Sequence, residues 1–323
     1  MRVASIYEPV QTELDLVEAT LKDVARSDVP GVQAMLEHVL SAGGKRLRPT
    51  VALLAGRFGH YEPELLVPLA ASIELLHTAT LVHDDVIDDA DTRRGRPTTN
   101  SRQHNGAAVM LGDYMFAHAA DLICRTESIE VVKLFSRTLM AMASGELRQD
   151  MSAYSYGQDT MQYFQRIAGK TASLFATSAE GGALVAGASR EWTDALRDYG
   201  ENLGMAFQIV DDILDFAGDE QELGKPTGSD LMEGTLTLPA LLLMERQPAD
   251  NPVKKLFASQ DGERDVHLAD ALTQIRESNI LDEATNVARD FRDRAAASLG
   301  PLPDSSDRAA LIEIADYVLS RRS

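Results

Sequence analysis

The chain has 323 residues, 44% of them hydrophobic, and its 50 acidic against 31 basic residues give a formal net charge of −19. Such a charge repels nucleic acid and anionic lipid, which disfavours a DNA- or RNA-binding function. The single cysteine, Cys124, excludes an intrachain disulfide and a cysteine-based zinc site, so we expect a reducing, cytoplasmic location. The N-terminus lacks a signal-peptide pattern. We also expect no transmembrane segment, since no apolar run approaches the roughly 20 residues that span a bilayer.

The stretches between glycine and proline breakers are rich in Ala, Leu, Met and Glu, which favour helices, so the sequence predicts an all-α fold. No Pro-, Gly- or Ser-rich linker divides the chain, and we expect one domain spanning residues 1–323. Apolar periodicity predicts long helices over residues 62–89, 105–125, 128–150, 160–186 and 191–216.

Polar loops separate several of these helices. Gly43-Gly44 ends a helix near Ser41 and Pro49 suits the first turn of the next, so Gly44–Arg48 is a predicted loop carrying three cations. Two further loops, Thr92–Asn100 and Gly218–Gly228, follow the two acidic segments described next.

The first acidic segment, HDDVIDD, ends the helix predicted over residues 62–89. Asp84 and Asp88 are spaced i and i+4 and share one helical face, whereas Asp85 lies about 100° away. Like charges at this spacing repel, and the negative end of the helix dipole adds to the cost. A bound cation would relieve both effects. Carboxylates without His or Cys partners favour Mg²⁺. The alternative is a solvated helix end.

The second acidic segment, QIVDDILDF, repeats this spacing with Asp211, Asp212 and Asp215 on an otherwise apolar helix. A solvated end explains one such cluster well. It explains two clusters, each embedded in Leu, Ile and Val, poorly. Together they predict a magnesium site.

Basic residues stand out in a chain this acidic. Arginine's planar fork and lysine's point charge both match phosphate oxygens, so these residues are candidate grips for two diphosphates. The alternative is basic loops that pair with nearby carboxylates. The candidates are Lys45, Arg46, Arg48, Arg93, Arg94, Arg96, Lys170 and Lys225.

Over nearly its whole length the chain resembles the trans-isoprenyl diphosphate synthase (polyprenyl synthetase) family, in motif order as well as content. The matching stretches are GGKRLRP at 43–49, ELLHTATLVHDDVIDDADTRRGRPT at 74–98, GDYMF at 112–116, GELRQ at 145–149, GKTASL at 169–174, GMAFQIVDDILDF at 204–216, LGKPTGSDL at 223–231 and TLPALLLM at 237–244. The resemblance implies an isoprenoid synthase type bundle of long, mostly antiparallel helices around an elongation cavity, and a homodimer. One departure is Thr235, where many relatives have a second lysine.

The resemblance also implies an activity. The enzyme would condense isopentenyl diphosphate with an allylic diphosphate, head to tail and trans, and release pyrophosphate. About three Mg²⁺ ions, or Mn²⁺ as a substitute, would be held by Asp84, Asp88 and Asp211, with Asp85, Asp212 and Asp215 as supports. Arg93, Lys170, Thr171, Gln208 and Lys225 resemble the allylic diphosphate residues. Lys45, Arg48, His77 and Arg94 resemble the isopentenyl diphosphate residues. Without the family resemblance, the favoured interpretation of His77 is a helix histidine that is hydrogen-bonded inside the bundle.

Product length depends on the helix that leads down from Asp84. Leu76, Ala79 and Thr80 lie on the turns before it, and short-product relatives usually place a bulky aromatic there, so we expect more than twenty carbons. Phe135 is a candidate floor. It lies roughly 16 Å along its helix from Glu146, which suggests a C30–C45 product. Ordinary core packing explains Phe135 equally well.

Competing interpretations remain. A geranylgeranyl or farnesyl diphosphate synthase would make a shorter product. A terpene cyclase or head-to-head synthase usually has a different second metal motif and no need of GGKRLRP. A subunit of a heteromeric synthase, or a helical scaffold, commonly lacks the aspartate motifs, and this chain has both.

Overall fold

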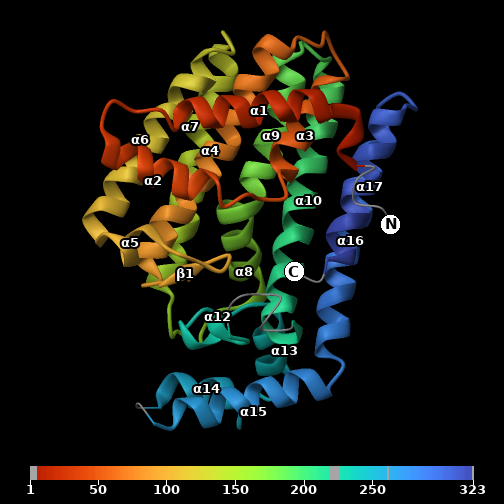
Figure 1. The fold of residues 1–323 in the computed structure, drawn as a ribbon. Helices are drawn as coiled ribbons and strands as arrows, with labels where there is room; N and C mark the ends of the chain where they lie inside the picture. The colour runs from red at the N-terminus through yellow and green to blue at the C-terminus, as the bar shows by residue number, and fades with distance from the viewer. Residues whose placement is uncertain (1–5, 219–225, 260–261, 322–323) are drawn as a thin grey trace. The chain divides into compact units, whose positions relative to one another are not determined.

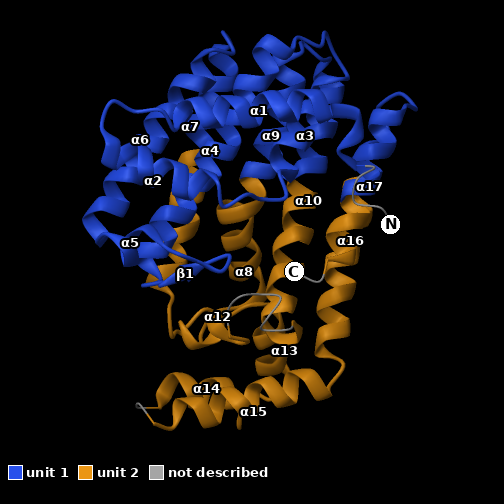
Figure 2. Cartoon of the chain, in the orientation of Figure 1, with its two compact units in different colours: residues 1–138, 174–200, 296–314 blue, residues 139–173, 201–295, 315–323 orange. Residues whose placement is uncertain are grey.

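A computed structural model describes residues 6–218, 226–259 and 262–321, and their regular structure is almost entirely α-helical (Figure 1). The predicted all-α fold is confirmed. The chain divides into two compact units, coloured separately in Figure 2: residues 1–138, 174–200 and 296–314, and residues 139–173, 201–295 and 315–323. We call them unit 1 and unit 2. Neither is continuous in sequence, and one domain over residues 1–323 stays a prediction.

Unit 1 contains residues 1–138 without interruption. Its elements are η2 (Glu8–Val10), α1 (Gln11–Val24), α2 (Pro30–Leu40), α3 (Leu47–Gly56), α4 (Pro63–Ile87), β1 (Thr92–Arg93), β2 (Arg96–Pro97), α5 (Thr99–Arg102) and α6 (Asn105–Cys124). Five further helices have residues in both units: α7 (Ile129–Met151), α9 (Ser173–Val185), α10 (Arg190–Ala217), α16 (Ile280–Ser298) and α17 (Ser306–Ser320).

Helix α4 is the centre of unit 1 and carries the first aspartate motif at its end. Pro63 occupies its first turn, where the missing N–H costs no hydrogen bond. Leu66, Leu69 and Ile73 are fully buried, and α4 packs against α1, α3 and α6. Elsewhere in the unit α3 and α9 approach closely, because a Cβ on Gly182 would lie 2.1 Å from the carbonyl oxygen of Ala52.

Unit 2 holds α8 (Thr160–Ile167), the π-helical turn η3 (Ala168–Ala172), α12 (Ser229–Met232), α13 (Leu238–Arg246), α14 (Pro252–Ala258) and α15 (Arg264–Glu277). Its core includes Tyr163, Ile209, Phe216, Leu241 and Ile275. Asp159 and Gln162 form a reciprocal capping box that fixes the start of α8.

The five predicted long helices are confirmed to within about two residues at each end, and the structure differs from the sequence predictions in three details. The helix expected over 160–186 contains η3, and the expected loop Thr92–Asn100 contains an antiparallel pair, with Thr92 opposite Pro97 and Arg93 opposite Arg96. Helix α3 begins at Leu47, so Arg48 is helical and does not lie in the loop.

The expectation that no apolar stretch is long enough to cross a membrane was wrong on length and composition. Pro63–Ile87 has a mean hydropathy of 1.7 and Asn105–Cys124 one of 1.2, and both pass that test. The most apolar 18-residue stretch of the first helix is 67% buried inside the protein, and that of the second helix is 39% buried. Buried core helices of soluble proteins meet the same criterion, so these two helices are weak evidence for a span.

Candidate functional site

The first aspartate motif ends α4, and the helix places its carboxylates differently. Asp84 is half-buried, Asp88 is exposed at the C-cap, and Asp85 is only 6% exposed. The spacing of 84 and 88 keeps both on the outer face, as predicted, while Asp85 turns inward. Asp84 and Asp88, with the exposed Asp89 beside them, are therefore the carboxylates of the motif that solvent reaches.

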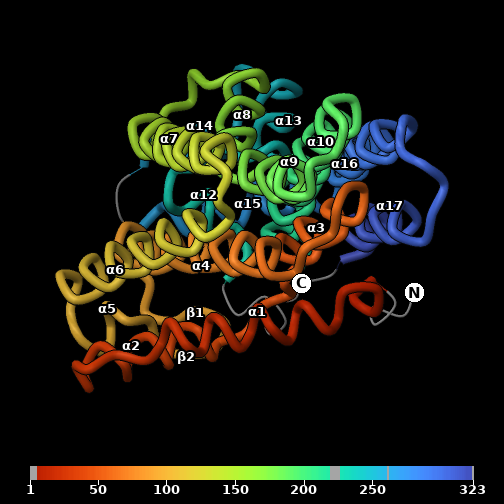
Figure 3. The backbone as a smooth tube through the Cα atoms, turned by 90° about the horizontal axis from the view of Figure 1, so that it is seen from above, coloured from red at the N-terminus to blue at the C-terminus, as the bar shows by residue number. Residues whose placement is uncertain are grey.

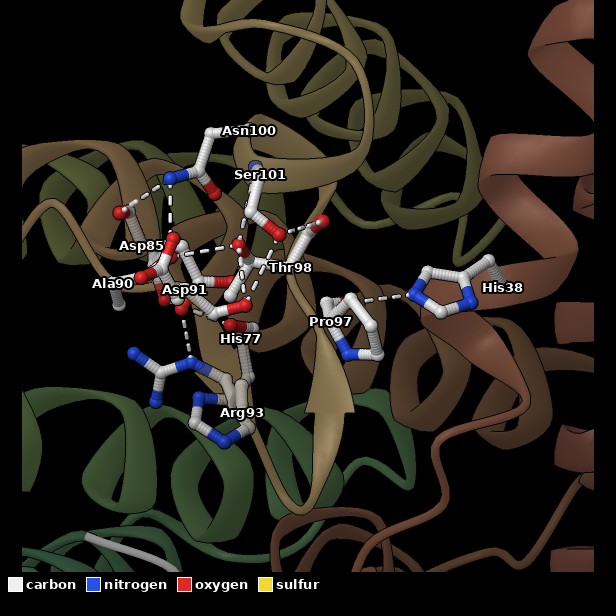
Figure 4. Close-up of polar contacts among 11 residues, drawn as sticks. His38, His77, Asp85, Ala90, Asp91, Arg93, Pro97, Thr98, Asn100 and Ser101 are labelled. Carbon is white, nitrogen blue, oxygen red and sulfur yellow. Dashed lines mark hydrogen bonds and ion pairs between the residues drawn. The ribbon is translucent and has the colours of Figure 1, made fainter.

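The Asp85 carboxylate forms an ion pair with the Arg93 guanidinium (Figure 4). Burial raises the pKa of Asp85, and the charge and hydrogen bond of Arg93 oppose that rise. Asn100 donates to the carbonyl oxygens of Asp85 at 3.2 Å and Ala90 at 3.1 Å, and Thr98 donates to Ala90 at 2.7 Å. The hairpin and α5 thus hold the end of α4 in place.

Cations gather around His77, about two turns before Asp84 on α4. Burial lowers the pKa of His77 well below its ordinary range, and the charges of Arg48, Arg94, Arg93 and Arg46 lower it further. The imidazole is therefore neutral at neutral pH and can still donate one hydrogen bond. A cavity in unit 1 is lined by His77, Arg46, Arg93 and Arg94.

Three of the four residues predicted for isopentenyl diphosphate thus lie close together. The charge of Arg48 reaches His77, and its guanidinium stacks 4.2 Å above the ring of Phe175, while Arg94 donates to the carbonyl oxygen of Gly43. Lys45 is exposed, and its carbonyl oxygen accepts from the Tyr7 hydroxyl at 2.6 Å.

Arg46 differs from its neighbours in the basic run. Its Nε lies 2.5 Å from Glu18 Oε1 and its Nη1 lies 2.5 Å from Glu74 Oε1. Two carboxylates therefore neutralise this guanidinium. The interpretation of Arg46 as a diphosphate grip does not agree with this geometry, whereas the alternative, a basic loop residue paired with carboxylates, does.

The second aspartate motif lies on the part of α10 that belongs to unit 2. Asp211 is partly exposed and pairs with Arg321 at 2.9 Å. Asp212 and Asp215 are 2% and 1% exposed, and Ser229 donates to Asp215 Oδ1 at 3.0 Å. Asp211 is therefore the most exposed of these three aspartates, and Asp212 and Asp215 are buried.

Asp212 is held by neutral donors on both carboxylate oxygens. Tyr163 donates to Oδ2 at 2.6 Å, and Gln208 Nε2 donates to Oδ1 at 2.8 Å. Thr171 in turn donates to Gln208 Oε1 at 2.6 Å, so the amide orientation of Gln208 is fixed. Burial, together with the charge of Asp230, raises the pKa of Asp212 to about 7.

Lys170 lies in the π-helical turn η3, a type of turn that is frequent at functional sites. Its Nζ lies 2.5 Å from Glu146 Oε2 and 3.3 Å from Gln149 Oε1. Gly145 makes this possible, because a Cβ there would lie 2.7 Å from the backbone nitrogen of Lys170. Two matching stretches, GELRQ at 145–149 and GKTASL at 169–174, therefore meet at this contact.

The remaining predicted site residues are Lys225 and the four candidates for product length. Lys225 lies outside the described residues. Of the chain-length candidates, Leu76 and Ala79 are fully buried on α4, Thr80 is half-buried, and Phe135 is 3% exposed in unit 1.

Sequence reasoning missed Glu18, Glu74, Tyr163 and Arg321 as partners of site residues. Tyr163 precedes Lys170 by seven residues, about two helical turns, which was an available signal. Arg321 lies 110 positions from Asp211, and no pattern links them.

The exposed aspartates fit a hard cation that shares its coordination with a substrate. Among residues 6–218, 226–259 and 262–321, no three His, Cys, Asp or Glu side chains converge on one metal position. Mg²⁺ is usually bound through one or two carboxylates plus substrate phosphates and water. The exposed aspartates offer only oxygen ligands, and few of them for each ion, which is the coordination that Mg²⁺ usually has in proteins.

Comparisons with known proteins find similar sequences and similar solved structures. The Polyprenyl synthetase family model matches residues 29–275. Heptaprenyl diphosphate synthase component 2 of Bacillus subtilis (strain 168) is 35% identical over 100% of this chain and 92% of its own. A crystal structure of polyprenyl synthase from Caulobacter crescentus CB15, complexed with calcium and isoprenyl diphosphate, matches with a TM-score of 0.93 and 36% identity, covering 99% of this chain and 98% of that one. Decaprenyl diphosphate synthase from Rhodobacter capsulatus matches with a TM-score of 0.90 and 35% identity over 99% of both chains.

Proposed function

The chain belongs to the polyprenyl synthetase family and is a prenyltransferase that makes polyprenyl diphosphates, and we propose that it does so with Mg²⁺ and ends at about C30–C45. The observation that carries the metal proposal is the selective exposure within the motifs. Asp84, Asp88 and Asp211 are partly or fully exposed, whereas Asp85, Asp212 and Asp215 are at most 6% exposed.

Asp84, Asp88 and Asp211 would hold the ions, about three in number, with Mn²⁺ as a possible substitute. When bound, the metal withdraws charge from the leaving diphosphate. A relative crystallised with calcium and isoprenyl diphosphate supports a divalent cation in this role. Arg321 pairs with Asp211, so the aspartate must exchange this partner for the ion.

The reaction breaks the bond between C1 and oxygen in the allylic diphosphate and joins C1 to the alkene of isopentenyl diphosphate. A proton then leaves for the departing pyrophosphate. Arg93 and Lys170 stabilise the charge on the leaving group, and Lys225 joins them by family resemblance. Thr171 and Gln208 turn neutral oxygen dipoles toward the cation. Their mutual hydrogen bond, 2.6 Å long, keeps them oriented before the charge appears.

Isopentenyl diphosphate is held by Lys45, Arg48, His77 and Arg94 without metal, which prevents its own ionisation. The neutral His77 donates a hydrogen bond, and the arginines supply the charge. This local set of cations offsets the net charge of −19, which otherwise opposes an anionic substrate.

A direct assay tests this function. We expect the purified single polypeptide to elongate farnesyl diphosphate with radiolabelled isopentenyl diphosphate in Mg²⁺, and to stop when EDTA is added. The matched control is Asp84→Asn together with Asp211→Asn. An inactive wild-type chain that becomes active only with another polypeptide would contradict the proposal and favour a subunit of a heteromeric synthase, as the name "component 2" suggests for its relative.

Product length has its own test. Ala79 is fully buried on α4, so Ala79→Tyr should block the chain early and cut products to about fifteen to twenty carbons. Phe135→Ala should lengthen them, because it opens space at a position only 3% exposed. Reverse-phase chromatography of dephosphorylated products measures both. Unchanged lengths in both variants would reject this assignment, and the wild type alone decides between C30–C45 and a geranylgeranyl or farnesyl product.

We propose a homodimer located in the cytoplasm. The helix α6 exposes three large apolar side chains close together, Val109, Met110 and Tyr114, which are 38–65% exposed. Apolar side chains grouped on a surface often mark a protein–protein contact. Light scattering of the purified chain should give twice the monomer mass of 35.2 kDa. A monomer that associates only with a second polypeptide would contradict it.

A further inference from the structure

The loop of residues 43–46 in unit 1 is held on several sides. Tyr7 donates to the carbonyl oxygen of Lys45, and Arg94 donates to that of Gly43. Thr50 donates to the carbonyl oxygen of Arg46 at 2.7 Å. Each contact fixes backbone, so the loop has one defined conformation beside the cation cluster.

Arg46 is the central contact of this loop. Its guanidinium joins Glu18 on α1 to Glu74 on α4, two helices that pack against each other (Figure 3). Burial alone would lower the pKa of Arg46, but the hydrogen bond that Arg46 donates to Glu18 and the charge of Glu74 raise it. Its φ of 49° is left-handed, a conformation that non-glycine residues rarely adopt. The ion pairs hold the residue there.

Glu74 gives the pairing its importance. Its side chain is 6% exposed, and it lines the same cavity as His77, Arg93 and Arg94. A Cβ on Gly44 would lie 3.3 Å from Arg94 Nη1 and 3.5 Å from Glu74 Oε1, so loop, cation and carboxylate are in contact. An unneutralised carboxylate here would repel a diphosphate, and a buried charge without a partner is costly.

We propose that Arg46 is a positioning residue for the isopentenyl diphosphate site and does not bind the diphosphate. It neutralises Glu74 within the cavity and fixes the loop that presents Lys45 and receives Arg94. The inference rests on the proposed function, because it presumes that these cations bind isopentenyl diphosphate.

The pairing makes a specific kinetic prediction. Arg46→Gln should raise the KM for isopentenyl diphosphate at least tenfold and leave the KM for the allylic diphosphate within twofold. Adding Glu74→Gln to the same chain should recover most of that loss, because the repelling carboxylate is gone. A role in stability alone would not produce this recovery, since the double variant has lost both partners of the pair.

Binding measured by calorimetry, with isopentenyl diphosphate in EDTA buffer, should follow the same order. The control is Arg26→Gln, because Arg26 pairs with Asp23 in an exposed i, i+3 contact and should change neither constant. Equal loss for both substrates, no loss, or no recovery on adding Glu74→Gln would overturn the proposal. If Arg46→Gln does not fold, Glu74→Gln alone removes the carboxylate that Arg46 neutralises and should leave the KM for isopentenyl diphosphate within twofold; a severalfold rise would then overturn the proposal.

Failure of the proposed function gives a different result. In that case the wild-type chain would not bind isopentenyl diphosphate in EDTA, and Lys45→Ala would have no effect on binding. A wild-type chain that binds, and loses binding in Lys45→Ala but not in Arg46→Gln, would overturn only the role of Arg46.

Discussion

The two aspartate motifs have the same spacing, but the protein surrounds them differently. In unit 1 the buried Asp85 has a cation, Arg93, as its partner, and the outer Asp84 and Asp88 are accessible. In unit 2 the buried Asp212 has only neutral donors, and a cation, Arg321, pairs with the accessible Asp211.

The difference explains why their acidities diverge. Arg93 opposes the effect of burial on the pKa of Asp85, whereas no cation contacts Asp212 among the hydrogen bonds and ion pairs described for it, and its pKa rises to about 7. Asp85 and Asp212 are therefore the same residue type at the same position of the two motifs, but they have different electrostatic surroundings. On the proposed function, the outer aspartates bind the metal ions and the inner ones support the helix end.

The largest expected effect separates outer from inner aspartates. Asp211→Asn should lower kcat by roughly 10³-fold or more, about 4 kcal/mol, because an accessible metal ligand is lost. Asp212→Asn should lower it far less, since its oxygens already bond to Tyr163 and Gln208. Initial rates with radiolabelled isopentenyl diphosphate measure both. Equal losses would mean that burial does not divide the motif.

A second test uses the neutral surroundings of Asp212. Its pKa is about 7 folded and about 3.9 unfolded, so between these values the folded state binds more protons. Stability is therefore lost as pH rises through this window, at up to about 1.4 kcal/mol per unit. The Asp212→Asn variant has no ionisable group at this position, so it lacks this contribution to the pH dependence of stability.

Urea unfolding of both chains in EDTA measures this. Relative to Asp212→Asn, the wild type should lose roughly 2–3 kcal/mol between pH 5 and pH 8. Any fixed cost of the substitution cancels in this difference. A difference that does not vary with pH would show that Asp212 is ionised throughout, as a cationic partner would make it.

The smallest effect concerns backbone contact in unit 2. Gly145→Ala puts a Cβ 2.7 Å from the Lys170 nitrogen, so η3 must shift and move Lys170 from Glu146. We expect about 1–3 kcal/mol of lost stability and a severalfold fall in kcat. Gly31→Ala is the control, because nothing lies within 4 Å of its added Cβ. Circular dichroism melts and initial rates compare the two; equal behaviour would reject close packing at Gly145.

Local patterns predicted much of this protein. Helical periodicity located α4, α6, α7 and α10, and the i, i+4 spacing placed Asp84 and Asp88 on one face with Asp85 turned away. These features depend on neighbours within about one turn of the chain, which the sequence displays directly.

Distant pairings could not be predicted in this way. Arg46 and Arg48 look alike in GGKRLRP, yet one contacts Glu18 and Glu74 and the other stacks on Phe175. Their difference depends on helices 28 or more positions away. The stretch Gly218–Gly228 with Lys225 lies mostly outside the described residues, so its predicted role stays a prediction.

The π-helical turn η3 changes the direction in which the side chains that follow it point around the helix axis. Tyr163 and Thr171 must both reach α10, at Asp212 and Gln208, yet eight residues of ideal α-helix rotate by about 800°, some 80° beyond two full turns. One wider turn between them absorbs part of that excess. Deleting a single residue within Ala168–Ala172 would therefore turn one of the two side chains away from its partner, even with every hydrogen-bonding group still present.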